Sequence, residues 1–455
     1  MKARLAAVFV LVLAIAAACQ GAPGGSFASP SAHGSAVGVG FDWPQYHQNA
    51  LRTGVGPGSP TLANPREAWR TSVDGDVYAS PLIVSGHVVV ATENNTVYAL
   101  DLFSGAVVWK QHVGDPVDAS SLPCGNIAPL SGITGTPVAD PATGRLYVVA
   151  FLRGYHHTLF TLSLADGSVL GQLAVDLPGS VPMVQQQRGA LALASGRVYI
   201  TFGGLYGDCG SYHGYVMAVP EGGGTVPWYR TPVAREAGIW APSGPTISSA
   251  TGFAYVVTGN GSATSTFGYS NSVIELTPDM QVHSYFAPSN WRALDAGDVD
   301  LGSVGPTLIS PLGVLLAIGK DGMAYLLKAD QLGGIGGQIA SRSVCSAAFG
   351  GTAWSGSMVW VPCTDGLVAL SLTASSITVA WKAAPPRVAS PILAAGAVWA
   401  IEPESGRLFA LDPATGAVVY STSLGSARHF SSPAATEGYV VAPAGDAVVA
   451  VATAA

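Results

Sequence analysis

Short runs in which hydrophobic and polar residues alternate recur along the chain and predict β-strands joined by tight turns. Residues 97–110 and 408–421 read VYALDLFSGAVVWK and LFALDPATGAVVYS, each an alternating strand, an Asp, a turn ending in Ser-Gly or Thr-Gly, and a second strand with a late aromatic residue. Weaker copies lie at 159–170 and 367–382. Because a strand–turn–strand unit cannot bury its apolar face alone, the recurrence predicts stacked units.

A small residue, often followed by Pro, marks the first strand of each unit. Ala190 and Thr352 fill two gaps in register, so the chain holds eight units, and 415 residues divided among eight give about 52 per unit. This length predicts an all-β, eight-bladed β-propeller of four-stranded antiparallel blades. The other six marks are Ser80-Pro81, Thr136-Pro137, Gly244-Pro245, Gly305-Pro306, Ser390-Pro391 and Ser432-Pro433.

The two ends of the propeller are predicted to share one blade. The last unit, from Ser431, has room for only about three strands before the chain ends, and residues 66–73 (REAWRTSV) read as an outer strand. Such closure by the N-terminal strand leaves no free sheet edge. Residues 41–455 are therefore expected to form a single propeller that needs no helices. We expect the tryptophans near the ends of outer strands to pack between neighbouring blades: Trp69, Trp109, Trp228 and Trp381.

Composition narrows the class of function. Only 10% of the residues are charged and the net charge is −7, with no run of Lys or Arg. Nucleic-acid binding is therefore not expected.

The N-terminus reads as an export signal. Lys2 and Arg4 precede the apolar run 5–18, which is too short to span a bilayer, and small residues lead directly to Cys19. We expect a signal peptide at 1–19 that ends in a lipobox-like site, with Cys19 lipidated and residues 20–40 as a Gly/Ser/Pro-rich tether. Ordinary signal cleavage with Cys19 discarded is the alternative. Both place the protein outside the cytoplasm.

The remaining cysteines agree with export. Four are left when Cys19 is set aside, and they permit three disulfide pairings. No two cysteines have the spacing of a haem-attachment motif or a zinc ribbon.

Several motifs together resemble the pyrroloquinoline-quinone-like propeller proteins. The resemblance spans nearly all of the expected exported chain and implies a β-propeller. In that family, quinoprotein dehydrogenases bind pyrroloquinoline quinone and Ca²⁺ on the propeller axis and oxidise alcohols, whereas outer-membrane assembly lipoproteins keep the propeller as a scaffold without a cofactor. The motifs are DWPQYHQNALRTGV (42–55), GDCGSYHGYV (207–216), GIWAPSGPT (238–246), DVDLGSVGPTLI (298–309) and GKDGMAYLLKADQLGG (319–334).

The resemblance implies only part of a quinone site. Trp240 matches the tryptophan that forms the floor under the quinone, and Asn260, in VTGNGS, matches an asparagine that ligates Ca²⁺. The family's Ca²⁺-ligating Glu falls where this chain has Cys209. The general base of the enzymes is an Asp directly after a Trp, and here Arg292 holds that place. A guanidinium stays protonated and cannot remove the proton of an alcohol.

The resemblance also guides the disulfide pairing. The adjacent-cysteine pair of the enzymes is reduced to Cys124 in the comparable loop. We therefore expect Cys124 to pair with Cys209 on long loops near the axis, and Cys345 to pair locally with Cys363.

Carboxylates and one arginine complete the candidate residues. Asp295, Asp298 and Asp300 are candidates for catalysis. Asp298 and Asp300 flank a single residue, so they are also candidates for binding one cation together with Asn260. The plainer interpretation is that these aspartates cap turns. Arg188 begins the third unit near the axis and is expected either to receive an anionic ligand or to cap a turn.

These observations favour an exported, non-catalytic binding or scaffold protein of the cell envelope. We expect a monomer that holds a small ligand or an envelope protein on its axial face. It would either be a lipoprotein that contacts the membrane only through its lipid anchor, or be secreted or periplasmic. The alternative is a divergent alcohol dehydrogenase that uses pyrroloquinoline quinone and Ca²⁺, with Trp240 as the quinone floor. Both hypotheses are tested below against the axial site.

Overall fold

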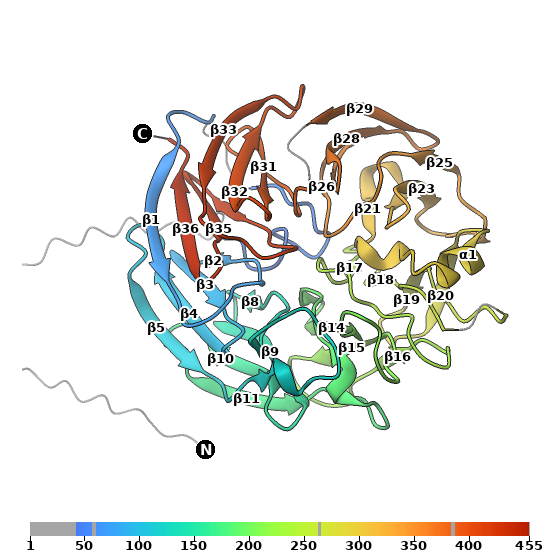
Figure 1. Cartoon of the computed structure of the whole chain (residues 1–455), viewed down its shortest axis with the longest axis horizontal. Coiled ribbons are helices and arrows are strands. Elements are labelled where there is room, and N and C mark those ends of the chain that lie inside the picture. Colours follow the sequence, from blue (N-terminus) through green and yellow to red (C-terminus); the bar gives the residue numbers. More distant parts are fainter. Residues whose placement is uncertain (1–41, 57–60, 263–264, 384–386, 455) are drawn as a thin grey trace, which may run out of the picture. The chain divides into compact units, whose positions relative to one another are not determined.

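The computed structural model describes residues 42–56, 61–262, 265–383 and 387–454, and the expected signal peptide, Cys19 and the tether lie outside this part. Eight antiparallel sheets follow one another around a ring (Figure 1). The predicted eight-bladed β-propeller is confirmed. In the described part, no helix has the length and apolar character needed to cross a membrane.

Each blade contains four antiparallel strands that run from the axis to the periphery. Blade 1 consists of β2 (Leu82–Val84), β3 (His87–Ala91), β4 (Thr96–Asp101) and β5 (Val107–His112). Blade 2 consists of β8 (Val138–Asp140), β9 (Arg145–Leu152), β10 (His156–Ser163) and β11 (Val169–Ala174). Blade 3 consists of β13 (Ala192–Ala194), β14 (Arg197–Gly204), β15 (Tyr215–Pro220) and β16 (Trp228–Arg230), with β12 (Gln185–Gln186) added beside β14. Blade 4 consists of β17 (Thr246–Ile247), β18 (Ala254–Val257), β19 (Val273–Leu276) and β20 (Val282–Ala287), with β24 (Gly334–Ile335) parallel to β20.

The second half of the ring repeats this arrangement. Blade 5 consists of β21 (Thr307–Ile309), β22 (Val314–Ala317), β23 (Met323–Lys328) and β25 (Ala340–Ser343). Blade 6 consists of β26 (Ala353–Ser355), β27 (Met358–Cys363), β28 (Gly366–Leu372) and β29 (Ile377–Ala383). Blade 7 consists of β30 (Ile392–Ala394), β31 (Ala397–Glu402), β32 (Arg407–Leu411) and β33 (Val418–Ser423). Blade 8 consists of β34 (Ala434–Thr436), β35 (Tyr439–Pro443), β36 (Ala447–Ala452) and β1 (Arg66–Ser72). A short hairpin of β6 (Val117–Asp118) and β7 (Leu130–Ser131) lies between blades 1 and 2.

The innermost strand of every blade begins one or two residues after the predicted small-residue mark. These marks sit where blades crowd together at the axis, and several join one blade to another: the amide of Ser80 donates to Thr136 Oγ1 at 2.8 Å, and the amide of Gly351 donates to Ser390 Oγ at 2.8 Å. A small residue is required there because the first strands of neighbouring blades contact each other.

The N-terminal strand closes the ring as predicted. β1 pairs antiparallel with β36 from Arg66 opposite Ala452 to Ser72 opposite Ala447. Figure 1 shows the blue β1 beside the red β36, so the two ends of the described chain complete one sheet. β1 thus covers the outer edge of β36, which would otherwise be the unpaired edge of a three-stranded blade.

Outer-strand tryptophans link neighbouring blades through the glycine-containing turn that recurs in the repeat. The indole N–H of Trp381 in blade 6 donates to the carbonyl of Pro413 in blade 7 at 3.0 Å. Its ring lies against Gly416, where an added Cβ would come within 2.6 Å of the indole and where φ is +73°. Trp69 and Trp109 make the same kind of contact with Leu102 and Leu164.

The expected packing is wrong for Trp228, whose side chain is exposed. The other three rings lie against a turn glycine of the next blade. In blade 4 the corresponding turn, 277–281, reads TPDMQ and has no glycine, so it offers no flat surface for the indole.

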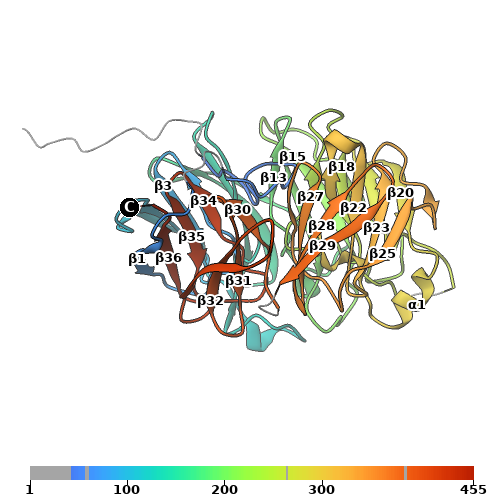
Figure 2. The same ribbon diagram turned by 90° about the horizontal axis from the view of Figure 1, so that it is seen from above.

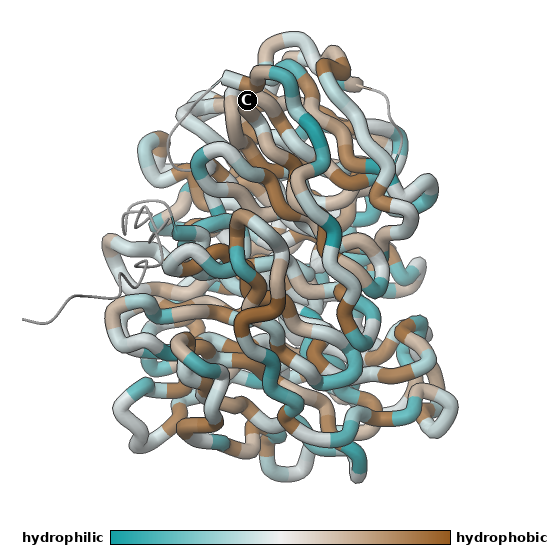
Figure 3. Tube along the Cα trace, turned by 90° about the vertical axis from the view of Figure 1, so that its left-hand side faces the viewer, coloured by the Kyte–Doolittle hydropathy of each residue, from teal (hydrophilic) through white to brown (hydrophobic). Residues whose placement is uncertain are grey.

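The hydrophobic core lies between the blades. The second and third strands are buried almost throughout, as in β36, whose six residues are all buried. Figure 3 shows brown, hydrophobic stretches along the strands, interrupted by white and teal positions. Burial on both faces of these strands follows from their position between neighbouring blades.

The expectation of a chain without helices is wrong at one place. A six-residue helix, α1 (Trp291–Ala296), lies outside the sheets at one end of the ring (Figure 2). It places the carboxylate of Asp295 to accept from the amide of Gly261 at 2.9 Å, from Ser270 Oγ at 2.7 Å and from Asn271 Nδ2 at 2.8 Å. The helix is thus fixed by its buried acidic side chain.

Residues 42–56 form a segment that closes the axis from one side, which we call the plug. The plug runs over the inner strands: Trp43 and Ile83 exchange backbone hydrogen bonds at 2.6 and 3.1 Å, and Leu393 donates to Gly54 at 2.7 Å. It makes hydrogen bonds with blades 1, 2, 3, 4, 6, 7 and 8. One segment therefore holds nearly the whole ring.

Arg52 is the central group of the plug. It is 4% exposed, and its guanidinium donates only to backbone carbonyls, those of Pro245, Tyr46, Ala190 and Leu191, at 3.0–3.4 Å. Burial lowers the pKa of Arg52 to about 9, so the group remains charged at neutral pH. The guanidinium thus joins the plug to blades 3 and 4 through dipoles rather than an opposite charge.

The turn glycine of the repeat is open to a direct test. Gly416→Ala adds a Cβ into the ring of Trp381 and also meets a positive φ, so we expect a loss of about 2–4 kcal/mol in unfolding free energy. Gly438→Ala is the matched control, because its φ is +80° but nothing lies within 4 Å of an added Cβ. Urea unfolding measures both. Equal losses would show that the tryptophan contact does not constrain Gly416.

The plug can be tested at Arg52. Arg52→Met leaves four buried carbonyl oxygens without their donor, so we expect the unfolding free energy to fall by about 3 kcal/mol or more. The control is Arg153→Met, because that side chain is 78% exposed and its loss should cost less than about 0.5 kcal/mol. If the two variants unfold at the same denaturant concentration, Arg52 does not hold the ring.

Candidate functional site

A pocket of about 500 Å³ lies on the axis among the segments that connect one blade to the next. We call it the axial pocket. Aromatic side chains supply much of its wall, and its charged groups come from blades 3 to 5: Arg188, Asp208, Asp298, Asp300 and Lys320. Tyr46 of the plug lies below, across a small hollow from Arg188. The plug and the inner strands thus make the floor of the site.

Lys320 lies between two of the predicted cation ligands. Its Nζ is 2.9 Å from Asp298 Oδ1 and 2.8 Å from Asp300 Oδ2, and it also donates to the carbonyl of Asp298 at 3.1 Å. Asp298 and Asp300 converge on one cation, and that cation is an ammonium of the chain itself. The turn between β22 and β23 carries Lys320 into this position.

Burial and charge set the titration of this group of side chains. Burial raises the pKa of Asp300 above its usual range, and the ammonium of Lys320 offsets part of that effect. Burial also works against the charged form of Lys320, but the carboxylate of Asp300 outweighs it, so the pKa of Lys320 is raised. An ion pair is therefore maintained at neutral pH.

The segment YVVTGNGS, residues 255–262, supports the ion pair of Lys320 and Asp300 through its backbone. The amide of Asn260 donates to Asp300 Oδ1 at 2.5 Å, and the carbonyl of Asn260 accepts from Ala237 at 2.7 Å. At Gly259 an added Cβ would lie 2.6 Å from Asp300 Oδ1 and 3.0 Å from Trp240 Nε1. The glycine is required because the carboxylate and the indole both approach the turn.

Trp240 lines the axial pocket, in agreement with its expected place near the axis. Lys320 Nζ lies 5.9 Å from the centroid of its ring, and the ring of Phe430 lies 6.2 Å away at an angle of 48°. An indole in this setting can stack a planar ligand or hold a cation over its face.

Asp295 and Arg292 lie away from these groups. The carboxylate of Asp295 is occupied by three hydrogen bonds at the end of α1, so its plainer interpretation as a local structural group fits its contacts. Arg292 on the same helix lies 4.5 Å over the ring of Trp291. Neither residue is part of the described wall of the axial pocket.

Arg188 enters the axial pocket from the start of blade 3. It is 9% exposed, and it contacts His429 Nε2 at 3.1 Å, Asn126 Oδ1 at 3.3 Å and Gln186 Oε1 at 3.0 Å. Burial lowers the pKa of Arg188 to about 10, so its charge persists at neutral pH. Both expected roles are compatible with these contacts, since the guanidinium bonds to its own loop and faces the pocket.

The two expected disulfides are present. Cys124 pairs with Cys209, and the loops that carry them contribute Asn126, Gly207 and Asp208 to the pocket wall. Cys345 pairs with Cys363, although Cys345 lies in the connection from blade 5 rather than within blade 6. In the described chain, the one cluster with metal-ligand spacing is Cys345, Cys363 and Asp365, and the disulfide already uses two of its members.

The donor set near the axis does not fit Ca²⁺. Calcium takes six or more oxygen ligands. Asp298 Oδ1 and both carboxylate oxygens of Asp300 bond to Lys320 or to the Asn260 amide, Asp208 Oδ1 accepts from the hydroxyl of Tyr212, and Asp295 bonds elsewhere. Trp240 keeps a ring at the pocket wall that suits a planar group, so the residues match a quinone floor but not its metal.

Sequence reasoning missed Lys320, His429 and Phe430. The repeat itself holds a signal for one of them: Phe430 stands two positions before the mark of its blade, Ser432, just as the predicted Arg188 stands two positions before Ala190. Residues at this register reach the axis and line the small hollow above the plug, as do Tyr78, Thr134 and Pro242. Lys320 lies inside a quoted motif, and in a chain with only 20 Lys and Arg residues its turn position is informative.

Part of the chain matches the model of a known protein family. A family model described as outer membrane protein assembly factor BamB matches residues 62–264. No curated protein matches the chain.

Solved structures similar to the chain include both enzymes and an assembly protein. A quinohemoprotein alcohol dehydrogenase from Pseudomonas putida HK5 has a TM-score of 0.73 at 13% identity, over 91% of this chain and 80% of that one. A europium-containing methanol dehydrogenase has a TM-score of 0.71 at 14% identity, over 90% and 98%. BamB from Moraxella catarrhalis has a TM-score of 0.58 at 13% identity, over 86% and 98%. At these identities the likeness establishes the fold and leaves the activity open.

Removing the cation of the axial ion pair should destabilise the protein in a pH-dependent way. In Lys320→Met the carboxyl of Asp300 stays buried without a cation, so the pKa of Asp300 rises further in the folded state. Its pKa in the unfolded chain stays ordinary. The folded variant then binds more protons than the unfolded chain between these two pKa values, so its stability falls as pH rises through that interval. At neutral pH we expect a loss of about 2 kcal/mol, reduced by the partial exposure of Lys320, and a smaller loss near about pH 4.

Urea unfolding at the two pH values measures this difference. Lys328→Met is the control, because its pair with Asp330 is exposed and should contribute less than about 0.5 kcal/mol at either pH. A Lys320→Met deficit that does not change with pH would contradict the described pairing.

Proposed function

We propose that this chain, which is a quinoprotein-like β-propeller repeat protein, is an exported, non-catalytic binding protein that holds a small ligand in its axial pocket. One observation carries the proposal: the ammonium of Lys320 lies between Asp298 and Asp300. The carboxylates of Asp298 and Asp300 are thereby paired with a cation of the chain itself. A ligand-binding role, unlike catalysis, does not require an unpaired carboxylate.

The charge balance argues against catalysis at this position. A general base must have a lone pair free to accept the proton of the substrate. Asp300 is 4% exposed, and its two oxygens accept from Lys320 and from the amide of Asn260. A carboxylate held in this way is a structural counter-ion for the ammonium, and the pocket that remains beside it is suited to binding.

Export to the cell envelope is part of the proposal. Two disulfides are expected in an oxidising compartment and are rare in the cytoplasm. Lipidation of Cys19 and a tether at 20–40 would keep the propeller at a membrane surface. An envelope protein bound over the same face is the scaffold form of this hypothesis, and the similarity to BamB supports it at the level of fold.

The second candidate is a divergent alcohol dehydrogenase that uses pyrroloquinoline quinone. The position of Trp240 favours it, because the indole ring lines the axial pocket and suits a planar cofactor. When bound, the quinone would accept the electrons of the alcohol. This chain would offer Trp240 as a stacking surface and Arg188 and Lys320 as cations, but the described carboxylates provide neither a calcium site nor an unpaired base.

A titration with pyrroloquinoline quinone separates the two candidates. We expect no Ca²⁺-dependent binding by calorimetry at micromolar quinone, and no reduction of an artificial dye when an alcohol is added. The control is Trp240→Ala, which should abolish any quinone binding that occurs at the axis and leave non-specific binding unchanged. Saturable, Ca²⁺-dependent binding with alcohol-dependent dye reduction, lost in Trp240→Ala, would overturn the proposal and establish the dehydrogenase.

A further inference from the structure

Arg188 brings a buried positive charge to the axial pocket without a carboxylate bound to it. Its hydrogen-bond partners are His429, Asn126 and Gln186, all of which are uncharged acceptors. Burial, together with the charges of Arg188 and Arg428, lowers the pKa of His429 to about 3, so this imidazole is neutral at physiological pH. Among the described ion pairs, none includes Arg188, whereas Lys320 has two. The buried carboxyl of Glu93 attracts this guanidinium without forming an ion pair with it, so Arg188 can still accept an anion from outside the chain.

Phe430 lies next to this charge in a conformation that bulky residues rarely adopt. Its φ is +66°, which is left-handed backbone that is unfavourable for a residue with a side chain. The guanidinium of Arg188 lies 5.2 Å from the centroid of its ring, and the ring of Phe349 stacks with it at a centroid distance of 6.2 Å. Strain of this kind persists where the surroundings hold the residue in place, and it gathers at ligand sites.

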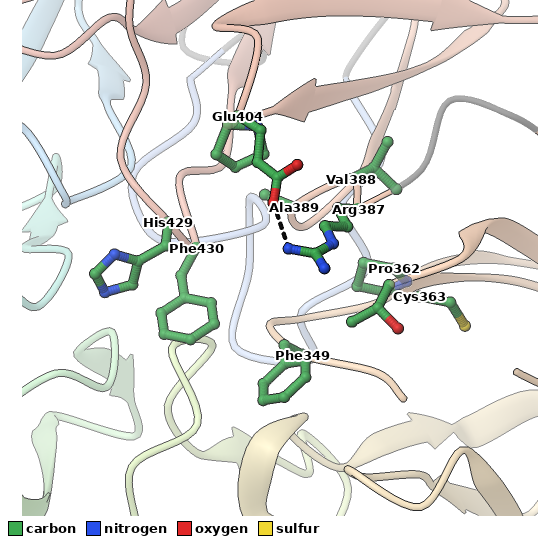
Figure 4. Close-up of a pocket in the computed structure, with 11 residues that line it drawn as sticks. Phe349, Pro362, Cys363, Arg387, Val388, Ala389, Glu404, His429 and Phe430 are labelled. Carbon is green, nitrogen blue, oxygen red and sulfur yellow. Dashed lines mark hydrogen bonds and ion pairs between the residues drawn. The ribbon is translucent and has the colours of Figure 1, made fainter. Parts of the chain in front are cut away.

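A second hollow begins on the other side of Phe430. This cavity, between blades 6 and 7, has a volume of about 190 Å³ and shares Phe349, His429 and Phe430 with the axial pocket. We call it the blade 6–7 cavity. Figure 4 shows Phe349 and Phe430 on one side of it and the ion pair of Arg387 with Glu404 on another.

The wall of the blade 6–7 cavity is mainly apolar. Pro362, Val388, Ala389 and Pro403 contribute to it, together with the two phenylalanines. Arg387 and Glu404 neutralise each other, so they leave no net charge for a ligand. A cavity of about 150 Å³ lined by apolar groups is large enough for benzene, so this one accepts a ring or a short alkyl chain.

We propose that the two hollows together bind an amphipathic monocarboxylate, with its carboxylate on Arg188 and its alkyl or ring portion across Phe430 in the blade 6–7 cavity. The inference rests on the proposed binding function and names the class of ligand. A single negative charge matches the one guanidinium of Arg188, because the ammonium of Lys320 is already paired with two carboxylates, those of Asp298 and Asp300. A guanidinium recognises a carboxylate through paired N–H donors, and the apolar cavity contributes affinity in proportion to the surface it buries.

A homologous series of acids tests this assignment by calorimetry. Acetate, butyrate, hexanoate and octanoate are titrated into the purified protein, and 1-octanol serves as the uncharged comparison. We expect the affinity to rise by about fourfold per added methylene until the cavity is filled, because each buried methylene contributes about 0.8 kcal/mol. Octanoate should bind at least about tenfold more tightly than 1-octanol, since the alcohol lacks the charge that Arg188 recognises.

Two variants locate the head and the chain separately. Arg188→Met should weaken octanoate by at least about tenfold and leave 1-octanol unchanged, and Arg188→Lys should restore part of the difference. Thr364→Trp places an indole in the blade 6–7 cavity, so acetate binding should persist while the gain with chain length disappears. Thr373→Trp is the control, an identical change at an exposed turn of the same blade.

Several results would overturn the inference. They are no binding of octanoate, equal affinity for octanoate and 1-octanol, an unaltered octanoate affinity in Arg188→Met, or a chain-length gain that survives in Thr364→Trp. If Arg188→Met does not fold, Arg188→Lys and the Thr364→Trp series still decide the matter. Failure here leaves the non-catalytic proposal in place, because that proposal is decided by quinone binding and dye reduction in the absence of any fatty acid.

Discussion

The plug, anchored by Arg52, is the constraint on which the rest of the structure depends. A ring of blades has an axis that side chains must fill or solvent will enter, and here one segment near the N-terminus fills it from one side. Arg52 donates to four backbone carbonyls, and His47 joins the carbonyl of Thr352 to Ser432 Oγ at 3.0 and 3.1 Å. Apart from the carbonyl of Tyr46, which belongs to the plug, these partners lie one or two residues before the inner strands. The plug therefore fixes the distance between blades, and the axial pocket lies among the blade-to-blade connections.

Charge compensation at the axis follows from the same geometry. A buried carboxylate pair needs a cation, because unpaired charges in a low-dielectric interior are costly. In this chain Lys320 supplies that cation from a turn of blade 5, and the backbone amide of Asn260 donates a hydrogen bond to the other carboxylate oxygen of Asp300. The axial pocket then contains a guanidinium, that of Arg188, that no carboxylate of the described chain binds directly. The described groups therefore leave Arg188 available to the proposed anion and offer no site suited to calcium.

Sequence reasoning predicted the fold well because the repeat reflects local rules. The small-residue marks, the turn glycines and the strand at 66–73 each express a steric or pairing requirement that can be read over a few residues. The site was harder to predict, since it depends on side chains that are distant in the chain. Asn260 was singled out as a calcium ligand, but its contribution to the described contacts comes from the backbone, and the resemblance to a calcium ligand did not indicate that. Lys320 was missed because its partners, Asp298 and Asp300, lie in another turn. The packing predicted for Trp228 was wrong because it depends on a turn glycine that blade 4 lacks.

Calcium binding is the most direct measure of the central claim that Lys320 occupies the cation position at the axis. Calorimetric titration of the wild-type protein with Ca²⁺ should show no site that Asp300→Asn removes, because the oxygens of Asp300 are already bonded within the chain. A calcium site in the wild-type protein that is lost in Asp300→Asn would contradict the account and show that the ammonium yields its place to the metal.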